Sequence, residues 1–130
     1  MELTKHKPFS GFSVDDTQAA KAFYGETLGL DVDQHGDMLW IKTNGDDGVL
    51  AYPKGDAHEP ASFTILNLPV DDVEATVDEL KSRGVSFEQY EGELATDDKG
   101  IMRDNGPDIA WFKDPAGNVI SVVEAGPLPD

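Results

Sequence analysis

The chain has 130 residues, of which 26 are acidic and 10 are lysine or arginine, so its formal net charge is -16. This charge repels nucleic acid and anionic membranes, and we expect neither as a partner. Cysteine is absent, which excludes disulfides, thiolate metal sites and a cysteine nucleophile and favours a cytoplasmic location. No apolar run approaches the roughly 18 residues of a membrane-spanning helix, so a soluble protein is predicted.

The excess of acids has two interpretations. The first is a solvated acidic surface that keeps the protein in solution, as a salt-rich cytoplasm would also require. The second is attraction of a cationic ligand. Because the acids are spread along the chain rather than confined to one motif, their pattern leaves both interpretations open.

The first half of the chain predicts a strand followed by a helix. The strand is expected at 9–14, and Asp15 and Asp16 follow it where a carboxylate can accept the free amides of a first helical turn. Gly29 is expected to end the helix. Its apolar stripe, at helical spacing, consists of Ala20, Phe23, Tyr24, Thr27 and Leu28.

A hairpin is predicted next, with strands at 39–42 and 49–52. The segment between them is rich in asparagine, aspartate and glycine, which tolerate the backbone conformations of tight turns. Its aspartates invite comparison with a calcium-binding loop, but the alternating ligands and the distant glutamate of such loops are missing. We therefore predict a turn rather than a metal site.

The second half begins in the same way as the first. A strand at 62–70 leads through Asp71 and Asp72 into a second helix, and Asp71 with Glu74 has the spacing of a capping box. The apolar stripe and the C-terminal signals of this helix are Val73, Val77, Leu80, Lys81, Arg83 and Gly84.

A second hairpin completes the repeat, with strands at 110–113 and 119–123, and Trp111 stands where Trp40 stands in the first hairpin. The recurring order indicates a duplicated βαβββ unit. We predict a single α+β domain of two tandem βαβββ modules, whose curved mixed sheets form a shared cup with the helices outside. A ferredoxin-like sandwich is the main alternative, and the paired hairpins argue against it. Module 1 is expected at about 7–55, a linker at about 56–60 and module 2 at about 61–125.

Five short stretches of the sequence carry a family resemblance: 12–16, 23–24 with 28–30, 70–73, 84–85 and 111–118. In this order and spacing they resemble the landmarks of the vicinal oxygen chelate superfamily of glyoxalases, bleomycin-resistance proteins and extradiol dioxygenases. The resemblance covers nearly the whole chain and implies the two-module cup. It implies no particular reaction, because this scaffold supports lyases, isomerases, oxygenases and pure binding proteins.

The resemblance also implies where metal ligands would stand. Members with metal chemistry place His, Gln or Glu on the first and last strands of each module. The first-strand positions fall here on Phe9 and Ile65, and the last-strand positions on Ser121 and near Ala51. A catalytic divalent ion needs about three ligands of the histidine or carboxylate kind, so we expect neither a metal nor another cofactor.

Strand alternation predicts which side chains line the cup. If Phe12, Val14, Leu66 and Leu68 face the helices, the alternate residues turn inward. These are Phe9, Gly11, Ser13, Val49, Ala51, Phe63, Ile65, Asn67, Val119, Ser121 and Val123. An apolar concavity with a few hydrogen-bonding groups is typical of a small-molecule site, and the alternative is that the larger of these side chains fill the cup as core.

Several further residues are candidates for function. Trp40 and Trp111 either fill the space between the halves or form the wall of a pocket, and Tyr52 and Asn67 could orient a ligand. His58 is the candidate catalytic base, since a neutral imidazole accepts a proton, and otherwise it is a surface histidine. One acidic segment is expected to be a solvated loop or, alternatively, to overhang the cup: Glu88, Glu91, Glu93, Asp97, Asp98 and Asp104.

Three functions remain at this stage. The first is a metal-free small-molecule-binding protein that sequesters an aromatic or cationic compound. The second is a glyoxalase- or dioxygenase-like enzyme with non-standard active-site residues, and the third is a structural or interaction module whose cup is filled by its own side chains. Many proteins of the superfamily pair as symmetric dimers, and we predict a homodimer that binds a small-molecule ligand.

Overall fold

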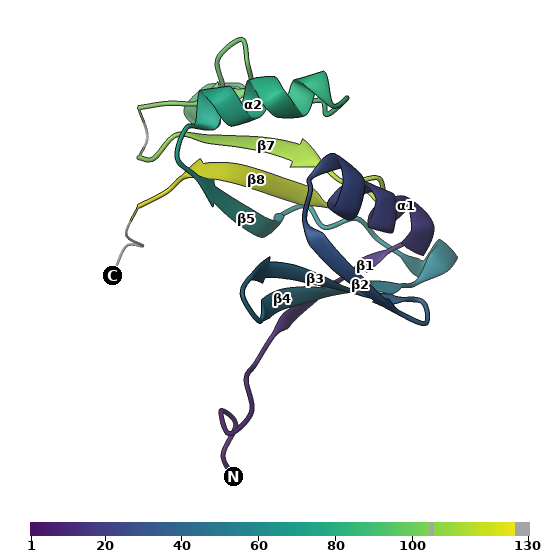
Figure 1. Cartoon of the computed structure of the whole chain (residues 1–130). Coiled ribbons are helices and arrows are strands. Elements are labelled where there is room, and N and C mark those ends of the chain that lie inside the picture. Colours follow the sequence, from purple (N-terminus) through teal and green to yellow (C-terminus); the bar gives the residue numbers. More distant parts are fainter. Residues whose placement is uncertain (105, 127–130) are drawn as a thin grey trace. The chain divides into compact units, whose positions relative to one another are not determined.

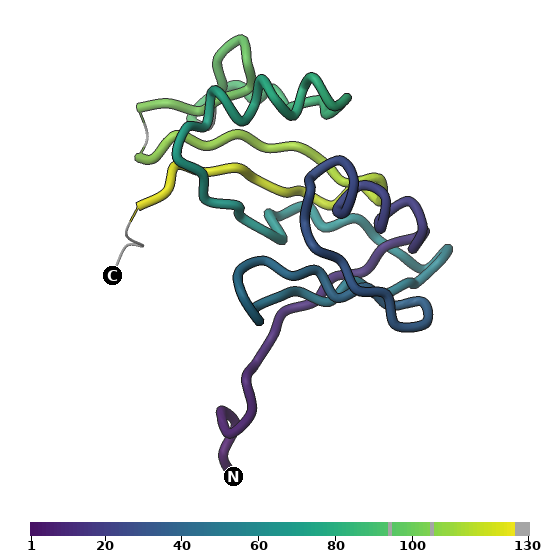
Figure 2. The backbone as a smooth tube through the Cα atoms, viewed as in Figure 1, coloured from purple at the N-terminus to yellow at the C-terminus, as the bar shows by residue number. Residues whose placement is uncertain are grey.

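Two compact units make up the chain, Met1–Pro60 (unit 1) and Ala61–Asp130 (unit 2). The computed structural model describes residues 1–104 and 106–126. Each unit contains one four-stranded mixed sheet and an α-helix that packs against it (Figure 1). The residues before the first strand form a tail that contains a turn near its start, as the backbone trace in Figure 2 shows. The predicted α+β architecture of two tandem modules is therefore confirmed.

The two units have the same topology. In unit 1 the strand order is β1-β4-β3-β2, and in unit 2 it is β5-β8-β7-β6; β1 with β4 and β5 with β8 are the parallel pairs. Unit 1 contains β1 (Ser10–Val14), α1 (Thr17–Lys21), the π-helix η1 (Ala22–Thr27), β2 (Asp31–His35), β3 (Met38–Asn44), β4 (Asp47–Pro53) and the 3-10 turn η2 (Gly55–Ala57). Unit 2 contains β5 (Thr64–Val70), α2 (Val73–Ser82), the 3-10 turn η3 (Gly92–Leu94), β6 (Ile101–Met102), β7 (Ile109–Lys113) and β8 (Val119–Glu124).

Both helices begin at an aspartate cap. The Oδ1 atom of Asp16 accepts the amide of Ala19 at 3.1 Å, and Oδ1 of Asp72 accepts the amide of Ala75 at 3.0 Å. The predicted capping box that begins at Asp71 is wrong, because Asp72 is the extended residue from which the helix starts. Among the described residues, no helix is long and apolar enough to cross a membrane.

The first helix changes type after about one turn. The sequence predicts one α-helix up to Gly29, but from Ala22 the backbone takes the wider π form, in which the amide of Leu28 bonds to the carbonyl of Phe23 at 2.9 Å. Gly25 lies inside this segment, and glycine costs an α-helix about 1 kcal/mol relative to alanine. The expected apolar stripe is retained in part, since Ala20 and Tyr24 are buried.

The core of unit 1 lies between its helices and one face of its sheet. The ring of Phe12 contacts that of Tyr24, with 5.7 Å between ring centroids, so this face of β1 is directed to the helices as predicted. Ala51 pairs with Phe12 across the parallel strands, and Val49 lies two residues before it on the same face. Both are buried, so the prediction that Val49 and Ala51 line the opposite, concave face is wrong.

The core of unit 2 is built in the same way. Val77 and Leu80 of α2 are buried, as predicted from the helical stripe, and so are Phe112 and Ile120, which pair across β7 and β8. The alternate residues of these strands, Trp111 and Ser121 among them, therefore lie on the face away from α2. In each unit we call the sheet face away from the helices the helix-free face.

The turn between β7 and β8 is held by a buried aspartate. Oδ1 of Asp114 accepts the amides of Ala116 and Asn118 at 2.9 and 2.8 Å, and its Oδ2 accepts the side-chain amide of Asn118 at 3.1 Å. Asn118 in turn accepts the amide of Ala61 at 3.0 Å. Both polar side chains are almost fully buried, so this turn also fixes the start of unit 2.

The acidic segment before β7 is partly tied to α2 by ion pairs. Arg103 bridges Asp97 at 2.9 Å and Glu74 at 2.6 Å, and Lys99 contacts Asp78 at 3.1 Å. Asp97 also accepts two backbone amides in this loop. Glu91, Glu93, Asp98 and Asp104 are exposed, which agrees with a solvated loop.

We expect a shallow loss of stability at acid pH that depends on Asp97. Although burial acts in the opposite direction, the bonds from Ile101, Arg103 and Lys99 hold the pKa of Asp97 below its ordinary value of 3.8. A lowered pKa stabilises the fold at neutral pH, and this contribution disappears as the pH falls below about 4 through the folded-state pKa. Because the side chain is 37% exposed, the effect should stay below about 1 kcal/mol. Urea unfolding from pH 7 to 3 should show a flatter acid limb for Asp97→Asn than for wild type or for Asp98→Asn, and equal limbs would contradict this assignment.

Candidate functional site

An aromatic cluster occupies the helix-free face of unit 1. The rings of Phe9 and Trp40 meet edge to face, with 5.5 Å between centroids. The indole also lies directly over Gly48, because a Cβ built there would be only 2.6 Å from two indole carbons. Phe9 is 62% exposed, so this cluster leaves aromatic surface open to a ligand.

A polar pair involves Ser13, which lies farther along β1 on the same helix-free face. Ser13 Oγ and His58 Nδ1 are 2.7 Å apart and partly buried. Ser13 pairs with Tyr52 across the parallel strands, which places Tyr52 on the same helix-free face. The structure therefore brings His58 and Tyr52, two predicted site residues, close to one hydroxyl.

The helix-free face of unit 2 has a comparable arrangement. Ser121 Oγ donates a hydrogen bond to Asn67 Oδ1 at 2.5 Å, so these two predicted residues are directly joined. Trp111 pairs with Ser121 on the neighbouring strand. Its ring contacts that of Tyr90 edge to face, with 5.4 Å between centroids. A hydrogen-bonding pair thus again shares the helix-free face with aromatic side chains.

Phe63 and Ile65 are less regular than strand alternation predicts. Phe63 lies before β5 and is 70% exposed. Ile65 lies where the register of β5 against β8 shifts, since Thr64 pairs with Val119 and Leu66 already pairs with Ile120. A bulge breaks the alternation of side chains, so the pairing does not define the direction of Ile65.

The repeat locates the last-strand ligand position of unit 1, which the sequence places only near Ala51. Asn67 corresponds to Gly11 in the repeat, and Gly11 pairs with Leu50 as Asn67 pairs with Ser121. The unit 1 counterpart of Ser121 is therefore Leu50, and Ala51 is a core residue. Of the four implied ligand positions, three carry hydrocarbon side chains and one carries a hydroxyl, a set that does not fit a divalent cation.

Charged groups lie near both aromatic sets, Phe9 with Trp40 in unit 1 and Tyr90 with Trp111 in unit 2. Asp33 pairs with Trp40 across β2 and β3, and Lys42 lies 3.2 Å from Asp33 and 3.5 Å from Asp31, so acids exceed bases at this edge. The hydrogen bond to Asp33 and the charge of Asp31 raise the pKa of Lys42.

In unit 2, burial raises the pKa of the Tyr90 phenol, and the nearby carboxylate of Glu88 raises it further. Glu88 itself lies 3.4 Å from Lys113. Tyr90 therefore remains a neutral hydrogen-bond donor across the physiological pH range.

Sequence reasoning missed Leu50, Tyr90 and the partnership of Ser13 with His58. Leu50 could have been found by aligning the two halves of the chain with each other. Tyr90 lies in a loop without periodicity, and the Ser13–His58 contact joins residues 45 positions apart, so no local signal indicates either.

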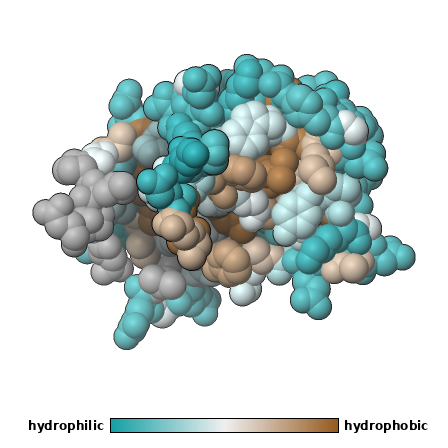
Figure 3. All heavy atoms as spheres, turned by 90° about the horizontal axis from the view of Figure 1, so that it is seen from below, coloured by the Kyte–Doolittle hydropathy of each residue, from teal (hydrophilic) through white to brown (hydrophobic). Residues whose placement is uncertain are grey.

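Figure 3, which draws one face of the molecule, also shows hydrophobic surface exposed among hydrophilic side chains.

Comparison with known proteins places the chain in a family. The sequence profile of the Glyoxalase/Bleomycin resistance protein/Dioxygenase superfamily matches residues 9–122. A search of curated proteins found no match.

Several solved structures share this fold. One is TnmS3, an antibiotic binding protein from Streptomyces sp. CB03234, at 28% identity and a TM-score of 0.65, covering 94% of this chain and 98% of that one. Another is a glyoxalase/bleomycin resistance protein from the same organism, at 29% identity and a TM-score of 0.59, covering 90% and 100%. A lactoylglutathione lyase from Agrobacterium tumefaciens is 26% identical with a TM-score of 0.62, covering 95% and 96%. The chain thus belongs to the glyoxalase/bleomycin resistance protein/dioxygenase superfamily.

Proposed function

We propose that this protein binds a small planar aromatic compound on its helix-free sheet faces, without a divalent metal. The observation that carries the proposal is the same in each unit: aromatic rings and a hydrogen-bonded polar pair, Ser13 with His58 or Asn67 with Ser121, share one helix-free face. Rings provide apolar and stacking contact, and the polar pair provides orientation. The likeness to an antibiotic binding protein supports this function.

Independence from metal follows from the side chains at the family's ligand positions. Phe9, Ile65 and Leu50 offer no lone pair, which leaves the neutral hydroxyl of Ser121 as a single weak ligand. Elemental analysis of the dialysed protein should show less than about 0.1 transition-metal ion per chain, since a stable site needs about three strong ligands. One tightly held ion per chain would overturn the metal-free proposal.

Aromatic recognition can be tested with N-methylquinolinium, a planar cation, by calorimetric titration. Trp111→Ala removes the ring beside Asn67 and Ser121, whereas Trp111→Phe keeps an aromatic face there. We expect Trp111→Ala to weaken binding by about tenfold, because an aromatic contact contributes about 0.5–1.5 kcal/mol besides the buried area. Trp111→Phe should weaken it by less than about threefold. Equal affinity of both variants and wild type would remove Trp111 from the site, and the corresponding pair at Trp40 tests unit 1.

We further propose that the acids beside the rings select cations. Asp33 lies opposite Trp40, so at low salt N-methylquinolinium should bind about threefold to tenfold more tightly than quinoline, its neutral planar analogue. Asp33→Asn should reduce this preference, whereas the exposed control Asp37→Asn should not. Added salt should weaken the preference gradually if the acidic field acts as a whole. Equal affinity for both probes at low salt would show that the acidity serves solubility alone.

An enzyme of the lyase or isomerase kind is the second candidate, and the contact between Ser13 and His58 favours it. A neutral imidazole held by a hydroxyl can accept a proton from a bound substrate. This alternative predicts that the protein turns over a superfamily substrate. His58→Gln should then abolish the turnover while ligand binding is retained.

A further inference from the structure

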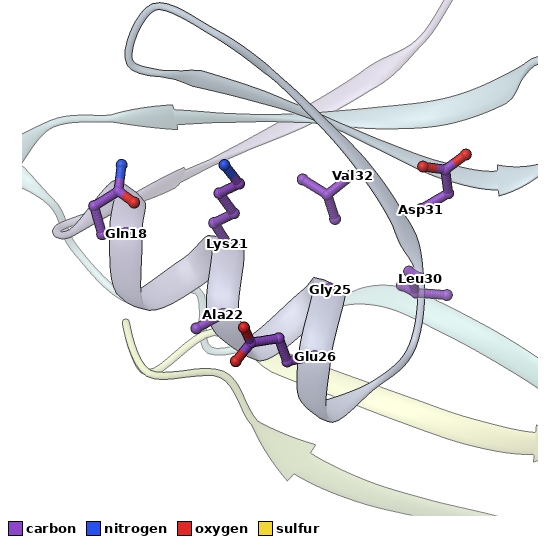
Figure 4. Close-up of a pocket in the computed structure, with 8 residues that line it drawn as sticks. All are labelled: Gln18, Lys21, Ala22, Gly25, Glu26, Leu30, Asp31 and Val32. Carbon is purple, nitrogen blue, oxygen red and sulfur yellow. The ribbon is translucent and has the colours of Figure 1, made fainter.

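A pocket lies in unit 1, between the first helix and the edge strand β2. It has a volume of about 400 Å³, within the range of roughly 300–1,000 Å³ common for small-molecule sites. Its lining comes from α1, η1 and the start of β2, as the close-up in Figure 4 shows. The lining residues are Gln18, Lys21, Ala22, Gly25, Glu26, Leu30, Asp31 and Val32.

The local fold explains why there is space at this point. The π-helix η1 is wider than an α-helix, and such segments frequently occur at functional sites. Gly25 leaves the middle of the pocket without a side chain: a Cβ there would meet only Val32, at 3.8 Å. Because β2 is the edge strand of its sheet, no further strand covers this side in the described part of unit 1.

The chemistry of the lining is amphipathic and has opposite charges. The floor is apolar, with Gly25, Leu30 and Val32. Figure 4 shows Lys21 and Asp31 extending on the same side of the helix, with Val32 between them. A ligand lying across Val32 would therefore meet an ammonium group at one end and a carboxylate at the other.

Both charged groups can still bind a ligand. Lys21 Nζ donates one hydrogen bond, to Gln34 Oε1 at 3.0 Å, and an ammonium has three donors. Asp31 approaches Lys42 only to 3.5 Å, and its side chain is 72% exposed. Glu26 is a second carboxylate in the lining, and Figure 4 draws it on the other side of the helix from Lys21 and Asp31.

We propose that this pocket binds a small zwitterion in which an amine and a carboxylate are separated by an apolar spacer. The ligand carboxylate meets Lys21, the spacer lies over Gly25 and Val32, and the amine meets Asp31. The pocket takes Val32 from the helix side of β2 and also Asp31, which pairs with Lys42 on the other face of the strand. None of the aromatic rings described above belongs to the lining, so binding here does not require the proposed aromatic ligand.

The test is a nuclear magnetic resonance titration of the whole chain with 6-aminohexanoate, with hexanoate and hexylamine as probes that each lack one charge. Saturable shifts are expected at the backbone amides of 18–32. Each singly charged probe should bind about threefold or more weakly, in line with the modest strength of exposed ion pairs. Equal binding of hexylamine or hexanoate, or shifts confined to other residues, would overturn the proposal.

Variants separate the three contacts. Lys21→Gln and Asp31→Asn should each weaken the binding of 6-aminohexanoate by about threefold. Lys21→Gln should also remove its preference over hexylamine, and Asp31→Asn its preference over hexanoate. Gly25→Leu should fill the pocket and weaken binding by more than about tenfold; if that variant fails to fold, Gly25→Ala, which the structure accommodates, should weaken binding less. Lys54→Gln, an exposed lysine outside the pocket, is the charge-matched control. Unchanged affinity in Lys21→Gln and Asp31→Asn would contradict the assignment, whatever the outcome for the aromatic ligand.

Discussion

Asp114→Ala should lower the free energy of unfolding by about 2–4 kcal/mol, because it removes three hydrogen bonds from a buried, charged acceptor. The amides of Ala116 and Asn118 would then lose their hydrogen bonds to this carboxylate. Asn118 would also lose the contact that orients it toward Ala61. The loss should appear in urea unfolding followed by tryptophan fluorescence, since Trp111 lies on the strand that enters this turn.

Two controls make this result specific. Asp98→Ala removes an exposed carboxylate from the same unit and should change stability by less than about 0.5 kcal/mol. Asp114→Asn keeps one acceptor oxygen for the backbone amides but brings an amide against the side chain of Asn118, so an intermediate loss is expected. A loss in Asp114→Ala no larger than that in Asp98→Ala would mean that the turn does not depend on this carboxylate.

Gly48→Ala should lower the stability by about 1–3 kcal/mol through overpacking on the helix-free face of unit 1. The new methyl group would lie 2.6 Å from the Trp40 indole and 2.8 Å from the backbone oxygen of Ile41. The indole would have to move, and its edge-to-face contact with Phe9 would be lost. We therefore expect a shifted near-ultraviolet circular dichroism signal together with the lower unfolding free energy.

The matched control is the same substitution at Gly25. There the added methyl group meets only Val32, at 3.8 Å, and the backbone is helical. Gly25→Ala should raise stability by about 0.4–1 kcal/mol, because it restricts the unfolded chain. If both substitutions had the same effect, the close approach of Trp40 to Gly48 would not be the cause.

The predicted elements with strong local signals are found in the structure. Both helices start at aspartates that cap them through neighbouring amides, and their buried residues repeat at helical spacing. These signals act over a few residues and need no knowledge of the rest of the fold. The sequence does not predict the two short strands β2 and β6, which lack such signals. The sequence of β2, Asp31–His35, contains one β-branched residue among polar ones, and β6 has only two residues.

The candidate site could be predicted only in part, because strand alternation requires a correct register. It placed Ser13, Asn67 and Ser121 on the helix-free faces, and the pairing of β5 with β8 agrees. It failed on β4, where the parallel pairing of Ala51 with Phe12 turns Ala51 toward the helices. Contacts between distant residues, such as Tyr90 with Trp111, depend on loop paths that no periodicity encodes.

The repeated topology has a consequence for how such a protein can change over evolutionary time. Its two halves retain nearly identical helix caps at Asp16 and Asp72, yet at equivalent strand positions one half carries Gly11 with Leu50 and the other Asn67 with Ser121. Residues that hold each half together are thus separate from those on the helix-free faces, where we propose that a ligand binds. A duplicated gene of this kind can acquire a new specificity in one copy of the motif while the other copy preserves the old one.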